Sequence, residues 1–483
     1  MDYAICAEDA VFRYLEKGKR NILDHVNLTL KQGSFTVLMG ASGSGKSTLA
    51  AVLCGLYPQN GGVLEGGRIT LFGQEVSTLS PQHRAKYVSM MFQNPDLQFC
   101  MDTLRQEMIF CMENICIPKE EMDERLLQTA KLFSMEQLLE RKLHTLSGGE
   151  KQKAALCCLA VLDSKCIVLD EALANLDEDS AAPIVQMLKT LHRQGKTIVV
   201  IDHKPDRWMD AADEIIVLGE GAKILARGIN KDNLAQYESL FHANGLFYPA
   251  KRQEKSNQNT ANEACLVLQN VTIPHPASTK KTPLAPLIEN ASATFPKGCM
   301  TALLGKSGSG KTTLFLSILK QLPFEGQIIL DGTDIKKLKP SALFSQIGVV
   351  FQNPGNQFIT QNVLQEVSAS LPSGDERAME LLESFSLAKY HRYSPYMLSQ
   401  GQQRRLAVLS VLAGGQKVLF LDEPTYGQDA KSTNSIMQLL KEKMEQEELS
   451  VVFITHDEDL AHAWADKIYR LQDRTLSEVS HET

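Results

Sequence analysis

The sequence lacks the features that would mark a membrane-spanning, secreted or nucleic-acid-binding chain. Its 483 residues contain no apolar run near the ~20 residues that a membrane-spanning helix needs. The opening segment, MDYAICAEDA, has no basic stretch followed by an apolar one, so we expect no secretory signal. The 50 Lys and Arg are outnumbered by 57 Asp and Glu, which gives a net charge of −7. That balance argues against a basic nucleic-acid-binding surface.

The ten cysteines are scattered, and no two of them form a C-x-x-C pair. Neither a zinc ribbon nor an iron–sulfur cluster is indicated, and we interpret the thiols as free and mostly buried. Hydrophobic residues make up 43% of the chain and charged residues 22%, which are ordinary globular values. The length is enough for two or three domains.

The chain is organised around residues 146–177, LSGGEKQKAALCCLAVLDSKCIVLDEALANLD. Within it, Ala155, Cys158, Leu159 and Leu162 recur at helical spacing and predict an amphipathic helix. A serine and two glycines stand directly before this pattern, where the free N–H groups of a helix N-terminus favour an anion.

The second half of this segment predicts a strand that carries chemistry. The apolar run CIVLD predicts a buried strand ending in Asp170 and Glu171. Paired carboxylates at a strand end suit a metal ion and a general base. A second copy of equal length, LSQGQQRRLAVLSVLAGGQKVLFLDEPTYGQD, spans residues 398–429, so a plain core helix and strand is a poor interpretation.

A glycine-rich segment, GASGSGKST, lies between the strand-like FTVLM and the helix-like LAAVLCGL, which is the context of a phosphate-binding loop (P-loop). Glycines let successive backbone N–H groups close around phosphate oxygens. Lys46 would reach the β- and γ-phosphates, and Ser47 would ligate Mg²⁺. The candidates are Gly40, Ser42, Gly43, Ser44, Gly45, Lys46, Ser47 and Thr48, and in a second copy Gly305, Ser307, Gly308, Ser309, Gly310, Lys311, Thr312 and Thr313.

Two polar residues follow other strand-like runs of the first copy. Gln93 follows YVSMMF, and His203 follows TIVVID, where a sensor of the γ-phosphate would be useful. Gln352 and His456 are their second copies. We also expect strands over 11–38, helices over 103–144 and a closing hairpin over 215–228.

The matched segments make the chain an internal duplication. The two copies are offset by 265 residues at the P-loop lysines, 259 at the glutamines, 252 at the strand-end aspartates and 253 at the histidines. The near-constant offset indicates two similar domains, at 1–248 and 265–483, and its decrease from 259 to 252 indicates a deletion in the second helical region. Residues 249–264, PAKRQEKSNQNTANEA, are polar and predict a flexible linker.

The motifs, in this order, resemble the ATP-binding cassette (ABC) ATPases over nearly the whole of each domain. LSGGE and LSQGQ, the signature segments, are the most specific part of the resemblance. It implies an α/β P-loop NTPase fold, with a RecA-like core, an N-terminal antiparallel β subdomain and a helical subdomain in each domain. It also implies an ATP hydrolase that uses ATP and Mg²⁺.

In that family two domains bind head to tail around two ATP molecules, each held by the P-loop of one domain and the signature of the other. The resemblance implies one site of Lys46, Asp170, Glu171 and His203 with Ser399 and Gly401, and another of Lys311, Asp422, Glu423 and His456 with Ser147, Gly148 and Gly149. Glu171 and Glu423 would activate water. The Mg²⁺ shells would comprise Ser47, Gln93 and Asp170, and Thr312, Gln352 and Asp422.

The segments FQNPDLQF and FQNPGNQF, and TLRQEMIFCMEN after the first, resemble energy-coupling-factor importers of vitamins and metal ions. The resemblance implies a peripheral ATPase on the cytoplasmic face of the cell membrane. Its partners would be a membrane scaffold (T-type) protein and a separate substrate-capture membrane protein. Leu97, Phe99, Phe358 and Ile359 would line grooves for a partner's amphipathic helix. Phe99 and Phe358 are equally suited to filling the domains' own helical layer.

Several positions depart from the family pattern. Tyr14, in VFRYL, fits the place of the aromatic residue that stacks on adenine, where the second domain offers His275. Gln400 replaces the first glycine of the second signature, and Ala172 and Leu173 stand where Pro and Thr are usual. Because both sites keep Lys, Asp, Glu and His, we expect two working but unequal sites.

Three alternatives compete with the importer. A soluble tandem cassette acting on ribosomes shares the duplication but would carry a long charged interdomain segment and a basic surface. A DNA-repair or chromosome ATPase would need a coiled-coil or zinc insertion between P-loop and signature, which this sequence lacks. A tandem sugar importer fits the length, and the paired QNPxxQF segments weigh against it.

Overall fold

The chain forms two compact units. Unit 1 comprises Met1–Pro249 with Asp429–Lys431, and unit 2 comprises Ala250–Gln428 with Ser432–Thr483. The computed structural model describes residues 2–16, 21–173, 176–248, 263–275, 284–306, 308–371, 374–425, 428–447 and 449–479. Among the helices in those ranges, none combines the length and apolarity that a membrane crossing requires.

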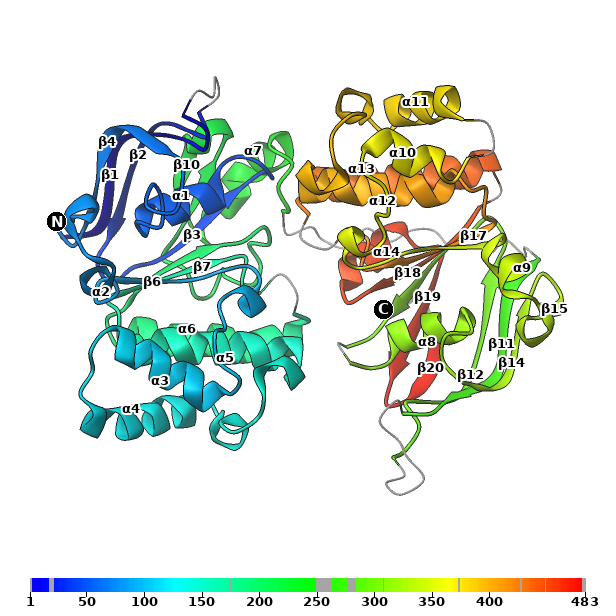
Figure 1. The fold of residues 1–483 in the computed structure, drawn as a ribbon, viewed down its shortest axis with the longest axis horizontal. Helices are drawn as coiled ribbons and strands as arrows, with labels where there is room; N and C mark the ends of the chain where they lie inside the picture. Colours follow the sequence, from blue (N-terminus) through cyan, green and yellow to red (C-terminus); the bar gives the residue numbers. More distant parts are fainter. Residues whose placement is uncertain are drawn as a thin grey trace. The chain divides into compact units, whose positions relative to one another are not determined.

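Unit 1 begins with a small antiparallel sheet in the order β2-β1-β4-β5 (Figure 1). In the second strand of the chain, buried and exposed residues largely alternate because one face packs on the core, and its buried Leu28 and Leu30 pair with Ala7 and Ile5 of the first strand. The strands are β1 (Tyr3–Arg13), β2 (Leu23–Lys31), β4 (Val63–Leu71) and β5 (Gln74–Glu75).

The main sheet of unit 1 has the order β10-β9-β3-β8-β7-β6, and all neighbours except β10 and β9 are parallel. Its strands are short apolar runs because both faces are covered: Ile167 and Leu169 of β7 enter one core cluster, and Cys166 and Val168 enter another. The strands are β3 (Phe35–Gly40), β6 (Val88–Met91), β7 (Cys166–Asp170), β8 (Thr197–Ile201), β9 (Glu214–Leu218) and β10 (Ile224–Ile229). The predicted closing hairpin corresponds to β9 and β10.

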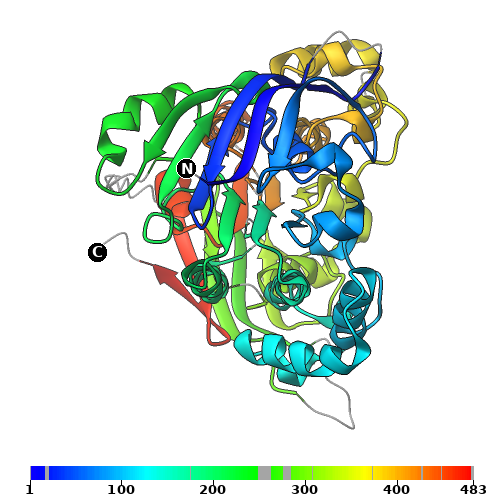
Figure 2. The ribbon, with the colours of Figure 1, turned by 90° about the vertical axis from the view of Figure 1, so that its left-hand side faces the viewer.

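Helices cover this sheet, and Figures 1 and 2 both place α3 and α4 (cyan) at the opposite end of unit 1 from the antiparallel sheet (blue). The helices are α1 (Lys46–Leu53), α2 (Pro81–Arg84), α3 (Leu104–Asn114), α4 (Lys119–Leu132), α5 (Gly148–Leu162), α6 (Glu178–Arg193) and α7 (Glu238–Ala243). The predicted helices over 103–144 are α3 and α4, followed by short 3₁₀ turns.

The prediction that α5 is amphipathic is wrong. Ala155, Cys158 and Leu159 are buried as predicted, but so are Leu156, Val161 and most other positions around the helix, and Leu162 is only partly buried. The reason is that α5 packs against several elements, among them α3, α4, α6 and β6. A helix with several packed neighbours buries more than one face.

Unit 2 repeats this architecture with sheets in the orders β12-β11-β14-β15 and β16-β17-β18-β13-β19-β20 (Figure 1). The predicted fold of two tandem α/β P-loop NTPase domains is thereby confirmed. The strands are β11 (Ala264–Ile273), β12 (Ile288–Pro296), β13 (Met300–Leu304), β14 (Glu325–Leu330), β15 (Thr333–Asp334), β16 (Ile347–Val350), β17 (Val418–Asp422), β18 (Ser450–Thr455), β19 (Lys467–Gln472) and β20 (Thr475–Val479). The helices are α8 (Lys311–Ile318), α9 (Pro340–Phe344), α10 (Val363–Ser368), α11 (Asp375–Ser384), α12 (Gln400–Leu412), α13 (Ala430–Glu447) and α14 (Glu458–Trp464).

The two units differ most in their helical regions. Helices α3 and α4 have 11 and 14 residues, whereas their counterparts α10 and α11 have 6 and 10. The shortening inferred from the residue offsets therefore lies in these two helices. Strand β11 begins at Ala264, the last residue of the predicted linker, and positions 249–262 of that linker lie outside the described residues.

Candidate functional site

The segment after β3 of unit 1 has the backbone geometry of a phosphate-binding loop. Gly43 and Gly45 have φ values of 81° and 101°, a region that side-chain-bearing residues rarely adopt. A Cβ on Gly40 would lie 2.5 Å from the carbonyl oxygen of Leu218, so only glycine fits there. These three glycines therefore allow the loop conformation in which backbone N–H groups are expected to surround a phosphate.

Lys46 begins α1 and turns back over this loop. Its Nζ donates to the carbonyl oxygens of Gly40 (2.8 Å) and Ala41 (3.0 Å), and the side chain is buried. Burial lowers the pKa of Lys46, although nearby carboxylates led by Glu171 oppose the shift. In unit 2, Nζ of Lys311 donates in the same way to the first two carbonyls of its loop, at 2.6 and 2.9 Å.

The P-loop hydroxyls form hydrogen bonds with the strand-end aspartates, so the residues predicted to hold Mg²⁺ lie side by side in each unit. Ser47 Oγ donates to Oδ1 of Asp170 at 2.9 Å, and Thr312 Oγ1 donates to Oδ2 of Asp422 at the same distance. Burial, and then the neighbouring charge of Glu171, raises the pKa of Asp170 to about 6. Burial likewise raises the pKa of Asp422.

These oxygen atoms fit Mg²⁺. The ion prefers hydroxyl and carboxylate oxygens and is commonly held by one or two carboxylates together with substrate phosphates. Accordingly, no cluster of three or more His, Cys, Asp or Glu suited to a metal occurs in the described ranges. Ser44 Oγ and Ser309 Oγ are buried without a hydrogen-bond partner among the described residues, which leaves one donor in each loop for an incoming anion.

Glu171 stands at the centre of a hydrogen-bonded group at the end of β7. Its Oε2 accepts from Nε2 of Gln93 at 2.9 Å, and its Oε1 lies 2.7 Å from Nε2 of His203. Burial by itself would raise the pKa of Glu171, but the hydrogen bond and charge of His203 hold it below its usual value. The carboxylate is therefore ionised at neutral pH, as a general base must be.

The backbone of this glutamate is strained in both units. Glu171 has φ 48° and Glu423 has φ 49°, in the left-handed region, and each N–H donates at 3.0 Å to the next strand, at Ile201 and Ile454. Such outliers persist only where the surroundings enforce them, commonly at functional sites. The same strain at the same position supports a shared role for the two carboxylates.

Unit 2 brings the same residues together with a different pairing. His456 contacts Oε1 of Glu423 through Nδ1, at 2.9 Å. Gln352 follows β16, but no side-chain hydrogen bond joins it to Glu423 in the described part of unit 2. Instead its backbone carbonyl accepts from the buried guanidinium of Arg404 at 2.6 Å. The two centres are therefore unequal in geometry.

Each signature serine caps a helix. Ser147 and Glu150 form a reciprocal capping box at the start of α5, and Ser399 and Gln402 form the same box on α12. The box occupies two of the N–H groups that the sequence assigned to an anion, so only the remaining groups, on the glycines Gly148 and Gly149, stay available. A Cβ on Gly148 would meet nothing within 4 Å, which explains why its counterpart tolerates Gln400, whereas a Cβ on Gly401 would approach Gln428 to 2.7 Å.

Tyr14 lies beside the P-loop helix. Its hydroxyl is 2.7 Å from Oγ1 of Thr48, and its ring packs edge-on against Phe12 and Tyr57. Tyr14 as a whole residue is 46% exposed, and stacking of its ring on adenine stays a prediction. His275 follows β11 and is partly buried. In unit 2, Gly305, Gly308, Ser309 and Gly310 lie in the matching loop, Thr313 lies in α8, and Ser307 lies outside the described residues.

The segments after the two glutamines are fixed by buried glutamates that sequence reasoning missed. Glu107 Oε2 accepts from the N–H groups of Cys100 (2.8 Å) and Met101 (2.7 Å), and Glu366 Oε2 accepts from those of Ile359 (3.1 Å) and Thr360 (2.9 Å). Their equal distance from the glutamines, 14 residues in both copies, was the available signal.

Only part of the predicted docking surface is exposed. Leu97 and Ile359 are 78% and 84% exposed, whereas Phe358 is buried in the core of unit 2 and is not a groove residue. Phe99 is partly buried against the core of unit 1. A groove of about 420 Å³ lies beside this segment, lined by Cys100, Met101, Asp102, Gln106, Ile109, Phe110 and Glu113.

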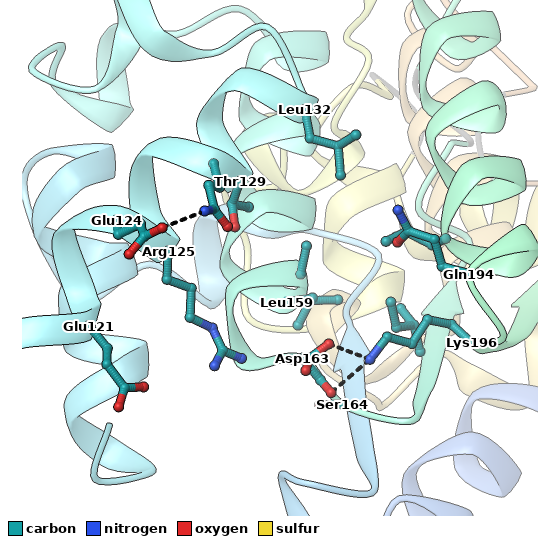
Figure 3. Close-up of a pocket in the computed structure, with 14 residues that line it drawn as sticks. Glu121, Glu124, Arg125, Thr129, Leu132, Leu159, Asp163, Ser164, Gln194 and Lys196 are labelled. Carbon is teal, nitrogen blue, oxygen red and sulfur yellow. Dashed lines mark hydrogen bonds and ion pairs between the residues drawn. The ribbon is translucent and has the colours of Figure 1, made fainter. Parts of the chain in front are cut away.

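A second pocket, of about 470 Å³, lies away from this chemistry (Figure 3). Its lining includes Arg125 of α4 and Ser164, Ile167 and Lys196, which lie at or just before the beginnings of β7 and β8. The catalytic candidates follow the ends of these parallel strands, so the pocket is at the other edge of the sheet. It takes no part in the site.

Comparisons with known proteins agree with this geometry. The family model described as ABC transporter matches residues 23–174 and 288–426. A relative in Bacillus subtilis, named as a candidate HMP/thiamine import ATP-binding protein, YkoD, is 34% identical over 99% of this chain and 91% of its own length. A relative in Saccharolobus solfataricus, named as a candidate ABC transporter ATP-binding protein, is 31% identical over 95% of this chain and 90% of its own length.

A solved structure of similar fold is ribosome-bound archaeal ABCE1 with Pelota. It matches with a TM-score of 0.68 over 98% of this chain and 78% of its own length. The sequence identity is 17%, so the likeness concerns the tandem fold alone.

Proposed function

We propose a transport function from one established premise: this chain belongs to the ABC transporter family, whose ATP-binding domains hydrolyse ATP. The chain is the energy-coupling subunit of a membrane importer of energy-coupling-factor type, for a vitamin or a metal ion. The observation that carries this proposal is a pair of exposed apolar side chains at the two glutamine segments: Leu97 lies within the first segment, and Ile359 directly follows the second. The name of the Bacillus relative includes import, which supports the proposal of an importer.

In this proposal the two units close on two ATP molecules within one chain. Lys46, Asp170, Glu171 and His203 act with Ser399 and Gly401, and Lys311, Asp422, Glu423 and His456 act with Ser147, Gly148 and Gly149. Both units belong to one chain, and tethering gives a high effective concentration of one unit at the other. Two-chain assembly is therefore not required.

At the first centre, Glu171 accepts a proton from the attacking water. Gln93 and His203 hold the two oxygens of its carboxylate, so that the base is oriented before the water arrives. Ser47 and Asp170 would hold Mg²⁺, which neutralises charge on the transferring phosphoryl group when bound. Lys46 supplies a further positive charge to the phosphates.

Coupling to a membrane partner follows from one continuous segment. Gln93 contacts the base, Pro95 begins a 3₁₀ turn, and Leu97 projects outward from that turn. Glu107 then ties the end of the segment to α3, so a movement at the nucleotide reaches the docking groove. We assign the groove and Leu97 to an amphipathic helix of the membrane scaffold, at the cytoplasmic face of the cell membrane.

The test is co-purification from membranes. Leu97→Glu and Ile359→Glu each place a charge on the docking surface and should abolish recovery of the membrane protein and transport, while ATP binding by the purified chain is retained. Leu225→Glu, which places the same charge at an apolar position of β10 that is 43% exposed, is the control and should behave as the parent. If the chain instead sediments with ribosomes and crosslinks to no membrane protein, the importer is wrong and the ribosome-acting tandem ATPase replaces it.

A further inference from the structure

Asp202, which directly precedes His203, is a buried carboxylate with three hydrogen-bond donors around it. Its Oδ1 accepts from the backbone N–H groups of His203 (2.6 Å) and Lys204 (3.1 Å), and its Oδ2 accepts from the indole N–H of Trp208 (2.7 Å). Trp208 has no exposed surface, and Asp202 is 5% exposed. Charge-assisted bonds in a buried setting are strong, so this network fixes the backbone on which His203 stands.

Arg207, in the same segment, grips the chain that follows the proposed base. Its two terminal nitrogens donate to the carbonyl oxygens of Leu173 (2.7 Å) and Leu176 (2.9 Å). Leu173 belongs to the pair that departs from the Pro-Thr of the family. Arg207 therefore supplies from another segment the restraint that the local sequence lacks.

The ring of His203 needs such a support. Its Nε2 lies 2.7 Å from Glu171, but its Nδ1 is buried and has no partner among the described residues. A functional histidine is usually oriented by a hydrogen bond at its second nitrogen. Here the orientation has to come from the backbone, which Asp202 holds.

Unit 2 solves the same problem differently. Thr455 takes the place of Asp202, and its hydroxyl accepts from the N–H of Asp457 at 3.0 Å. Asp457 in turn caps α14 by accepting from Leu460, the residue at the position of Arg207. A capped helix supports His456, whereas a carboxylate, an indole and a guanidinium support His203.

We propose that Asp202, Trp208 and Arg207, here named the clasp, are positioning residues of the first hydrolysis centre, absent from the second. The clasp keeps His203 against Glu171 and keeps the segment after Glu171 in place. Its loss slows hydrolysis at this centre without weakening ATP binding, because none of its side chains bonds to the P-loop in the described part of unit 1. The inference rests on the proposed role of Glu171 as the base.

The experiment introduces the residues of unit 2 into unit 1. Asp202→Thr and Arg207→Leu are made in the full chain carrying Glu423→Gln, so that single-turnover hydrolysis reports the first centre. A displacement of about 1 Å costs on the order of 10²-fold, so we expect each rate constant to fall by about 10- to 100-fold. The dissociation constant for ATP should stay within about twofold, and Arg227→Leu, which removes a surface pair with Glu214, should change neither quantity.

A rescue distinguishes positioning from general destabilisation. In Asp202→Asn, the side-chain amide N–H group faces the indole N–H of Trp208, and two donors cannot bond to each other. Trp208→Phe removes the indole donor and keeps an aromatic ring. The double variant should therefore hydrolyse ATP faster than Asp202→Asn alone. If the two defects were independent, their effects on the rate would combine and the double variant would be slower than either single variant. A double variant that is slower than both single variants overturns the clasp.

The two hypotheses fail in different ways. If the Glu423→Gln chain hydrolyses ATP no faster than the chain that also carries Glu171→Gln, the role of Glu171 is wrong and the clasp fails with it. If Glu171→Gln abolishes the reaction but Asp202→Thr and Arg207→Leu leave it at the parental rate, the clasp alone is wrong.

Discussion

Replacing Asp170 by Asn should make unit 1 more stable in the absence of nucleotide. Asp170 is 7% exposed, and burial together with Glu171 raises its pKa from 3.8 to about 6. The folded state therefore binds the proton more tightly than the unfolded state, and holding the ionised form costs stability above that pH. Two units of pKa correspond to about 3 kcal/mol.

Because the pKa of Asp170 is raised in the folded state, the stability changes within a defined pH range. Between about pH 4 and 6 the native carboxyl is protonated and the unfolded one is not, so the free energy of unfolding falls as the pH rises through this range. Asn keeps an acceptor for Ser47 and carries no charge. At pH 7.5 the variant should exceed the parent by up to about 3 kcal/mol, and the difference should vanish near pH 4.

Urea unfolding measures this change in one unit. The chain has two tryptophans, Trp208 in unit 1 and Trp464 in unit 2, so a Trp464→Phe background reports unit 1 by fluorescence. Asp123→Asn, on the exposed surface of α4, is the matched control and should leave the midpoint unchanged. A variant that is no more stable than the parent at pH 7.5, or a difference that does not depend on pH, refutes the reasoning.

Three further predictions concern nucleotide chemistry. Glu171→Gln and Glu423→Gln should each lower turnover with the membrane partners by ~10²–10⁴-fold, because both centres keep the glutamate that we propose as the base; parental turnover for Glu423→Gln would mean that the second centre binds nucleotide without hydrolysing it. The chain carrying both changes should, with ATP, show the mass of one chain and a smaller radius by light scattering, and an obligate two-chain mass would contradict closure within one chain. Gly40→Ala should weaken ATP binding by at least about tenfold by calorimetry, since its Cβ would lie 2.5 Å from the carbonyl oxygen of Leu218 and overpacking costs roughly 1–3 kcal/mol.

Burial in the helical region could not be read from the sequence. Helix α5 shows an amphipathic pattern in Ala155, Cys158 and Leu159, yet α3, α4, α6 and β6 all pack against it and most of its positions are buried. Phe358 and Ile359 are adjacent and both apolar, but one is buried and the other is 84% exposed. Which of two neighbouring side chains faces the core depends on elements distant in the chain.

The duplication, the fold class and the positions of the phosphate loops could all be predicted from the residues alone. These features are local: the positive φ of Gly43 and Gly45, the helix that begins at Lys46 and the strand that ends at Asp170 each arise within a few residues. Parallel strands then bring their carboxyl ends to one edge, so the motif order already predicts a common site.

The hydrogen bonds that hold the glutamate and histidine of each centre could be seen only in the tertiary structure. Asp202 accepts a hydrogen bond from the indole of Trp208, and Arg207 donates to carbonyl oxygens 31 and 34 residues away. Glu171 accepts from Gln93, which lies 78 residues away. The two histidines follow matching strands, yet they meet their glutamates through different ring nitrogens. Hydrogen bonds between distant segments depend on how the segments pack, and neither spacing nor composition encodes that packing in a readable form.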